Sequence, residues 1–181
     1  TSLNYNVPNF LENINQSIKG KKIGIIKEFD LSDLDTEIQK RFEESKNAYE
    51  NLGAEFIEIS LPNISASVPT YYSIAPAECS SNLSRFDGVR YGHRAENTDD
   101  LNDLYIKSRS EGFGDEVKRR ILIGTYALSA GYYDAYYKKA QQVRRLIKND
   151  FDHVFKSVDL LMTPTSPSTA FKFESKGTQN P

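Results

Sequence analysis

The sequence predicts an α/β fold, and three features carry the prediction. A β-branched strand pattern, a helical pattern and a second strand pattern follow one another between residues 22 and 61. Two long helical patterns occupy the stretch 112–158, and a third short strand follows at 159–162. Strand, helix and strand in this order favour a parallel βαβ unit with a right-handed crossover. A chain of 181 residues normally forms one domain.

The first twenty residues predict an extended lead that contains one short helix. Pro8 suits the first turn of a helix, and Phe10, Leu11 and Ile14 would give it a small apolar face. The β-branched run 22–27, with a lysine at each end, then predicts a buried strand.

A turn at 32–35 leads to a helix predicted over 36–52. Thr36 and Gln39 have the spacing of a capping box, in which two side chains satisfy free backbone donors at a helix start. Gly53 stands where a left-handed residue ends a helix, and the apolar run 56–61 predicts the second strand.

The next segment is helical in pattern but rich in small and polar residues. It covers 64–85, and Pro69 and Pro76 are expected to break or kink it, because proline removes a backbone donor and clashes with the preceding turn. A loop rich in glycine and charge is predicted at 86–96, and a short helix at 99–109.

The stretch Gly112–Ile147 is expected to organise the rest of the fold. Its first helix repeats Val117, Ile121 and Leu128 beside the small Gly124, and a stop is expected at 130–131. The second helix continues the pattern in an apolar stripe of about seven turns, on the order of 40 Å long. The positions of this stripe are Tyr133, Tyr136, Ala140, Val143, Ile147, Phe151, Val154 and Val158.

Composition excludes several classes of protein. The net charge of −2 and the pI near 5.8 argue against a dedicated nucleic-acid binder. No apolar run has the length of a membrane span, and no signal-peptide pattern opens the chain. The single Cys79 suits a reducing cytoplasm, and one cysteine with two histidines makes a zinc site unexpected. A start at Thr1 and an end at Pro181 suggest a piece of a longer protein.

Arg120 is the most informative candidate for chemistry. The triplet Lys118–Arg120 is most simply a solvated helix face, as exposed charges usually are. However, Arg120 follows Val117 by three positions, about 60° around the helix, so it lies at the edge of the buried stripe. A guanidinium there can reach into a cleft and bind a carboxylate through two parallel hydrogen bonds.

The remaining candidates have simpler interpretations. Tyrosines and lysines alternate over 131–139, which could indicate base stacking. Tyr133 and Tyr136 belong to the apolar stripe, however, so a tyrosine-rich core or a subunit contact is favoured. Tyr71 could line a pocket. His93 and His153 have no metal-ligand spacing, and no serine has an adjacent general base that would mark it as a nucleophile.

Several longer segments resemble a known family. They are APAECSSNLSRFDGVRYGHRA at 75–95, EGFGDEVKRRILIGTYALSAGYYDAYYKKAQQVRRLIKNDF at 111–151 and LLMTPTSPSTAF at 160–171. These segments resemble the amidase signature family and, within it, the glutaminase subunits of tRNA-dependent amidotransferases. GKKIGIIKEF and LGAEFIEISLP are similar to the same subunits, so the resemblance covers essentially the whole chain.

The resemblance implies an amidase signature-type fold, a mixed sheet flanked by helices. This chain would hold only a partial segment of it, with one βαβ unit and two long helices. Residues 1–181 would form part of a single domain. The glycine- and serine-rich stretch that carries the family's catalytic serines and lysine is expected before Thr1, and a pocket aspartate is expected after Pro181. This piece alone is therefore expected not to hydrolyse glutamine.

The implied activity is that of a carbon–nitrogen ligase with glutamine as amide donor. Glutamine is hydrolysed, and partner subunits B and C use the ammonia to amidate glutamate carried on tRNA(Gln), or in many organisms aspartate on tRNA(Asn). By this resemblance Arg120 and Tyr71 bind the substrate glutamine, and the chain holds no catalytic residue. It holds no cofactor, since ATP and Mg²⁺ serve the complex, with the metal in a partner subunit. The partner also binds most of the mischarged tRNA, and no membrane is involved.

A second hypothesis is a stand-alone helical module that binds RNA or protein through its lysine, arginine and tyrosine side chains. The acidic net charge and the long resemblance favour the amidotransferase glutaminase.

Overall fold

The computed structural model describes residues 4–171. The chain folds as two compact units, one formed by Thr1–Leu61 with Asp152–Pro181 and the other by Pro62–Phe151. The first unit holds a small parallel sheet with a helix, and the second is helical, so the α/β prediction is confirmed. Within the described residues, every helix is too short or too polar to cross a lipid bilayer.

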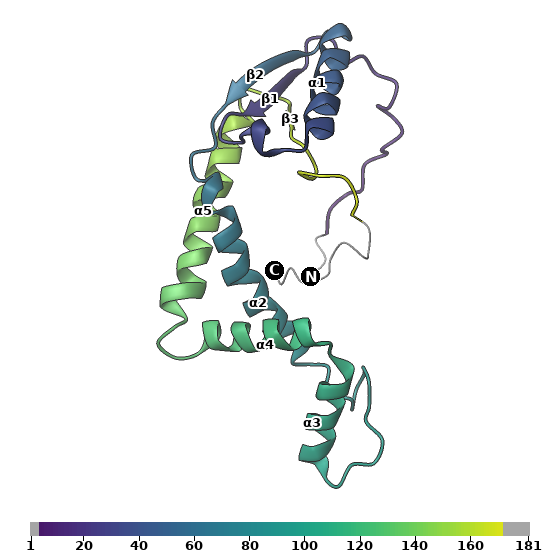
Figure 1. The fold of residues 1–181 in the computed structure, drawn as a ribbon, viewed down its shortest axis with the longest axis vertical. Helices are drawn as coiled ribbons and strands as arrows, with labels where there is room; N and C mark the ends of the chain where they lie inside the picture. The colour runs from purple at the N-terminus through teal and green to yellow at the C-terminus, as the bar shows by residue number, and fades with distance from the viewer. Residues whose placement is uncertain (1–3, 172–181) are drawn as a thin grey trace. The chain divides into compact units, whose positions relative to one another are not determined.

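The first unit is built on a three-stranded sheet in the order β2-β1-β3 (Figure 1). Its strands are β1 (Lys22–Ile26), β2 (Glu55–Ile59) and β3 (Leu160–Met162), close to the predicted ranges. Both pairings are parallel, and Ile23 pairs with Phe56 on one side and with Leu160 on the other. The core of this unit consists of buried apolar side chains, namely Ile23, Ile26, Phe42, Ala54, Ile59, Leu61, Val154 and Val158.

The crossover from β1 to β2 runs through a short 3-10 helix, η1 (Leu31–Asp33), and α1 (Thr36–Asn51). The predicted capping box of Thr36 and Gln39 is wrong. Asp35 is the N-cap and accepts from a first-turn backbone N–H, while the Gln39 amide donates to a backbone carbonyl at 2.8 Å. Aspartate and threonine are both favoured N-cap residues, so the sequence pattern does not decide between Asp35 and Thr36 as the helix start. Gly53 has φ +91°, as its predicted position requires.

The short helix predicted in the N-terminal lead is also wrong. The segment 10–15 forms only turns. Phe10, Leu11 and Ile14 are 76%, 72% and 68% exposed. A few turns of helix are unstable in water unless an apolar face is buried, and this face remains in solvent.

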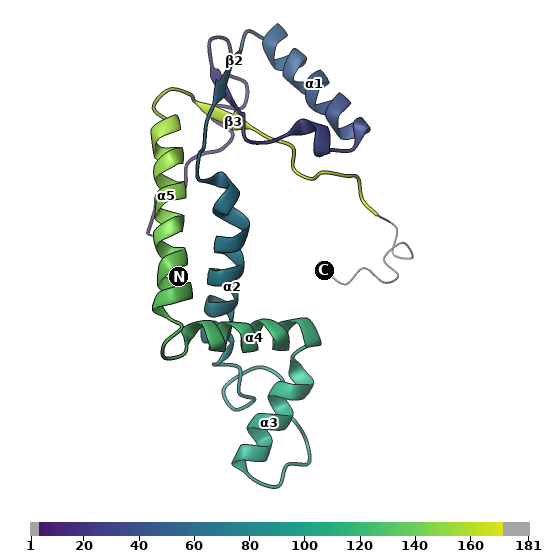
Figure 2. The same cartoon turned by 60° about the vertical axis from the view of Figure 1, so that its left-hand side comes forward.

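The second unit contains the remaining helices. A 3-10 turn, η2 (Ile64–Ala66), precedes α2 (Ser67–Leu83); α3 (Leu101–Gly112) follows the loop. α4 (Asp115–Leu128) crosses the C-terminal half of α2, as both views show (Figures 1 and 2).

Neither proline breaks α2, contrary to the prediction. Pro69 lies in the first turn, where no backbone N–H is needed. Pro76 lies inside the helix and is buried. At Pro76 the backbones of α2 and α4 approach so closely that a Cβ at Gly124 would lie 1.9 Å from the Pro76 carbonyl oxygen. This packing offsets the hydrogen bond that proline removes.

The second long helix differs from its prediction at both ends. A stop occurs at Gly131, with φ +87°, as expected. A π-helical turn, η3 (Asp134–Lys138), then precedes α5 (Lys139–Val154), so the helix ends before Val158. Tyr133 and Tyr136 are 45% and 48% exposed, so a tyrosine-rich core is wrong. The π-helical turn at 134–138 interrupts the 3.6-residue repeat on which the predicted stripe depended. A subunit contact through them remains a prediction.

Candidate functional site

Arg120 and Tyr71 lie together in the second unit. Arg120 is on α4 and Tyr71 is on α2, 49 positions apart in sequence. The Arg120 Nη1 donates to the Tyr71 phenolic oxygen at 3.5 Å, the long limit of a hydrogen bond. The structure thus brings both predicted binding residues to one place, and their role in binding glutamine remains a prediction.

The crossing of α2 and α4 sets this meeting point. α4 begins after Gly114, which is extended at φ −67° and ψ 164°. One turn beyond Arg120, the missing side chain of Gly124 lets the two backbones touch at Pro76. The Ser80 and Thr125 hydroxyls share a hydrogen bond of 2.8 Å across the same crossing. Arg120 precedes Gly124 by four residues and Tyr71 precedes Pro76 by five, so both lie on the same side of the crossing, where their side chains meet.

A neighbouring carboxylate orients the Arg120 guanidinium. Glu116 Oε1 accepts from Arg120 Nε at 2.8 Å, and Glu116 Oε2 accepts from Arg119 Nε at 2.8 Å. Hydrogen bonds from Arg120 and then Arg119 lower the pKa of Glu116, and those with Glu116 and then Tyr71 raise the pKa of Arg120. Glu116 therefore stays ionised and Arg120 stays cationic near neutral pH.

This arrangement can bind an anion but has no evident group for proton transfer at neutral pH. Glu116 holds the Nε side of the guanidinium and Tyr71 contacts Nη1, while 40% of the Arg120 side chain is exposed to solvent. An oriented planar cation of this kind suits a carboxylate. Among the described residues no group of histidine, cysteine, aspartate or glutamate side chains could hold a metal ion.

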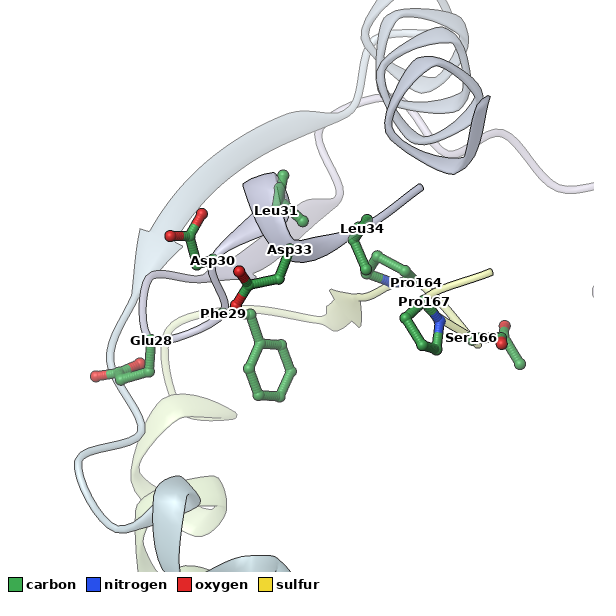
Figure 3. Close-up of a pocket in the computed structure, with 10 residues that line it drawn as sticks. Glu28, Phe29, Asp30, Leu31, Asp33, Leu34, Pro164, Ser166 and Pro167 are labelled. Carbon is green, nitrogen blue, oxygen red and sulfur yellow. The ribbon is translucent and has the colours of Figure 1, made fainter. Parts of the chain in front are cut away.

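The first unit has a pocket that the sequence analysis did not identify. It lies at the carboxyl ends of β1 and β3, the usual edge for ligands in parallel sheets, and has a volume of about 340 Å³ (Figure 3). The lining residues are Glu28, Phe29, Asp30, Leu31, Asp33, Leu34, Pro164, Thr165, Ser166 and Pro167. The extended proline-rich segment directly after β3 was the available signal for it.

Two of the acids in this pocket are engaged in local structure. Glu28 accepts from the Leu61 backbone N–H at 3.0 Å and from the Ser60 hydroxyl, and these bonds, in that order, lower its pKa. Asp30 accepts from the Ser32 backbone N–H at the start of η1, and its hydrogen bonds with Ser32 lower its pKa. The pocket therefore does not present free carboxylates poised for acid–base chemistry at these two positions.

Comparison with known proteins identifies relatives over nearly the whole chain. The model of the Amidase family matches residues 1–181. The A subunit of glutamyl-tRNA(Gln) amidotransferase from Alkalilimnicola ehrlichii is 61% identical over 171 residues, covering 94% of this chain and 35% of that protein. The A subunit from Hahella chejuensis is 63% identical over 161 residues, covering 89% of this chain and 33% of that protein. The chain spans about a third of the length of these relatives.

Solved structures share the fold. The crystal structure of the glutamyl-tRNA(Gln) amidotransferase A subunit from Thermotoga maritima matches with a TM-score of 0.65 at 39% identity, over 96% of this chain and 32% of that one. A bacterial aryl acylamidase of the amidase signature family matches with a TM-score of 0.55 at 19% identity, over 81% of this chain and 27% of that one. The second likeness supports the fold alone.

Proposed function

This chain belongs to the amidase family, and on that premise we propose that it is part of the glutamine-hydrolysing subunit of a tRNA-dependent amidotransferase. Identities near 60% to the A subunits of glutamyl-tRNA(Gln) amidotransferases support this assignment over other amidases, and over a stand-alone helical module. The complete glutaminase would act in the cytoplasm and release ammonia from glutamine for the synthesis of Gln-tRNA(Gln).

The proposed role of this segment is to bind the amino-acid end of glutamine. The observation that carries the proposal is the Arg120 guanidinium, oriented by Glu116 and next to the Tyr71 hydroxyl. Hydrolysis of the side-chain amide leaves the α-carboxylate of glutamine unchanged, so that group is available as a fixed handle. A bidentate contact to Arg120 would place the distal amide at the nucleophile.

The covalent chemistry is assigned elsewhere in the glutaminase. No segment of the sequence resembles the glycine- and serine-rich stretch with the serine nucleophile of amidase signature proteins. We therefore assign binding but no catalytic residue to this chain and expect no hydrolysis from it alone. Partner subunits B and C would use the ammonia, with ATP and Mg²⁺ bound outside this chain and the mischarged tRNA held mainly by a partner.

The test is the kinetics of Arg120 variants in the complete subunit within its complex. Arg120→Ala removes one charge-assisted pair, which is worth about 1.5–3 kcal/mol, so glutamine-dependent kcat/KM should fall by about one to two decades, mostly through KM. Arg120→Lys should recover only part, because an ammonium lacks the planar fork. Amidation supported by added ammonia should not change.

Arg119→Ala is the matched control. Arg119 binds the same Glu116 carboxylate but points about 100° away on the helix, so glutamine KM should change less than about twofold. An unchanged glutamine KM in Arg120→Ala, or an equal loss of ammonia-dependent activity, would show that Arg120 is a structural residue.

A further inference from the structure

The start of α2, the helix that carries Tyr71, has no cap of its own. Ala66 stands at the N-cap of α2 and offers no side-chain hydrogen bond, and Asn63, the N-cap of η2, does not cap that turn either. Val68 is 60% exposed while Thr70 in the same turn is buried, so the first turn of α2 packs on one side only. A helix start without a side-chain cap frays more easily unless another element holds it.

Asp150 of α5, 87 positions away in sequence, forms hydrogen bonds with Asn63 just before this helix start. One carboxylate oxygen, Oδ2, accepts from the Asn63 backbone N–H at 2.9 Å and from Asn63 Nδ2 at 3.0 Å, and Oδ1 accepts from Nδ2 at 3.1 Å. The three bonds are charge-assisted and partly buried, which makes them stronger than exposed polar contacts. The negative charge also lies at the positively polarised end of the η2–α2 segment.

A second polar contact lies near the other end of α2. Tyr137 of η3 donates to Glu78 Oε1 at 2.6 Å. Asn63 contacts Asp150, and Glu78, later on the first segment, contacts Tyr137, earlier on the second. α2 therefore lies antiparallel to the η3–α5 segment, as Figures 1 and 2 show. The two contacts bracket the part of α2 that carries Tyr71.

We propose that Asp150 is a positioning residue that sets Tyr71 against Arg120 by anchoring the start of α2. The inference rests on the proposed glutamine-binding role of that pair. Tyr71 lies between the anchored Asn63 and the crossing at Pro76, and its hydrogen bond to Arg120 is already at the 3.5 Å limit. A small outward movement of the first turns of α2 therefore breaks that bond, while the crossing itself stays in place.

The experiment compares Asp150→Asn with the parent in the complete subunit within its complex. An asparagine NH₂ cannot accept from the Asn63 donors, so the anchor is weakened with little change in shape. Glutamine KM should rise by about two- to tenfold, the effect of one lost positioning hydrogen bond. The kcat for added ammonia should not change. Asp134→Asn, which removes only an exposed ion pair with Lys138, should leave both values unchanged.

Two further variants separate positioning from general stability. In a Tyr71→Phe background, Asp150→Asn should raise glutamine KM no further, because Asp150 is proposed to act through the Tyr71 hydroxyl. The exchange Asn63→Asp with Asp150→Asn restores an amide–carboxylate pair and should recover part of the KM. If Asp150→Asn does not fold, Asn63→Ala removes only the two side-chain donors and is expected to show the same KM effect.

Equal losses of glutamine-dependent and ammonia-dependent kcat with an unchanged KM would overturn the proposal, as would a full additional effect in the Tyr71→Phe background. Arg120→Ala shows whether only the positioning role of Asp150 fails or the proposed binding site fails as well. If Arg120→Ala raises glutamine KM and Asp150→Asn does not, the positioning role is wrong and the binding site stands. If neither raises it, the proposed site is wrong as well.

Discussion

Replacing Gly124 with alanine should force α2 and α4 apart. The new Cβ would lie 1.9 Å from the Pro76 carbonyl oxygen, 2.5 Å from its carbonyl carbon and 2.8 Å from Ser80 Cβ. The first two are backbone atoms of a buried helix residue, so no side-chain rotation can relieve the overlap. The helices must separate or α4 must shift along α2.

The expected cost follows from two opposing terms. Overpacking of a well-packed site costs about 1–3 kcal/mol and occasionally more, and a backbone clash of this depth belongs at the upper end. Alanine in place of glycine favours the helix by about 1 kcal/mol. The net destabilisation of Gly124→Ala should therefore be about 2 kcal/mol. Because Arg120 is one turn from the crossing, glutamine KM should rise as well.

Thermal unfolding and glutamine kinetics of the complete subunit measure both effects. Gly114→Ala is the matched control, since nothing lies within 4 Å of a Cβ there and only a helix N-cap preference of about 1 kcal/mol or less is lost. An unfolding midpoint for Gly124→Ala equal to that of the parent, with an unchanged glutamine KM, would refute the close crossing of α2 and α4.

Two pH-dependent effects are also expected. The Lys22 backbone N–H and then the Lys21 ammonium lower the pKa of Asp159, so its contribution to stability is present above its ordinary pKa of 3.8 and is lost as the pH falls below that value. Urea unfolding should show Asp159→Asn less stable than the parent at pH 6, with the difference in stability narrowing as the pH falls below 3.8; a difference independent of pH would contradict this. A hydrogen bond with Tyr132, followed by desolvation, raises the pKa of Tyr126 to about 12. Ultraviolet titration should find this tyrosine protonated at pH 11 in the parent but not in Tyr132→Phe, and identical titration curves would count against the contact.

The regular elements were predictable because their signals are local. The β-branched run before Lys27 and the apolar run after Gly53 indicated both strands of the βαβ unit within a residue or two. The features that failed depend on neighbours distant in sequence. Pro76 is tolerated inside α2 because α4 packs on it. The segment around Phe10 forms no helix because its apolar side chains remain in solvent.

The candidate site was only partly readable from the sequence. Helical spacing alone placed Arg120 at the edge of a buried face, and the family resemblance supplied Tyr71, whose partner lies on another helix. Glu116 was not identified from the sequence, although it stands four positions before Arg120, the spacing at which helix side chains pair. Asp150 was not identified either, because its partner Asn63 lies 87 positions away.

The most direct measurement compares glutamine with glutaminamide, in which an amide replaces the α-carboxylate, as ligands of the complete subunit. The parent should bind glutamine more tightly by about ten- to a hundredfold, the worth of one charge-assisted pair. In Arg120→Ala this preference should fall to near unity, because the guanidinium proposed to bind the carboxylate is gone. An equally strong preference for glutamine in Arg120→Ala would contradict the assignment of Arg120 to the α-carboxylate.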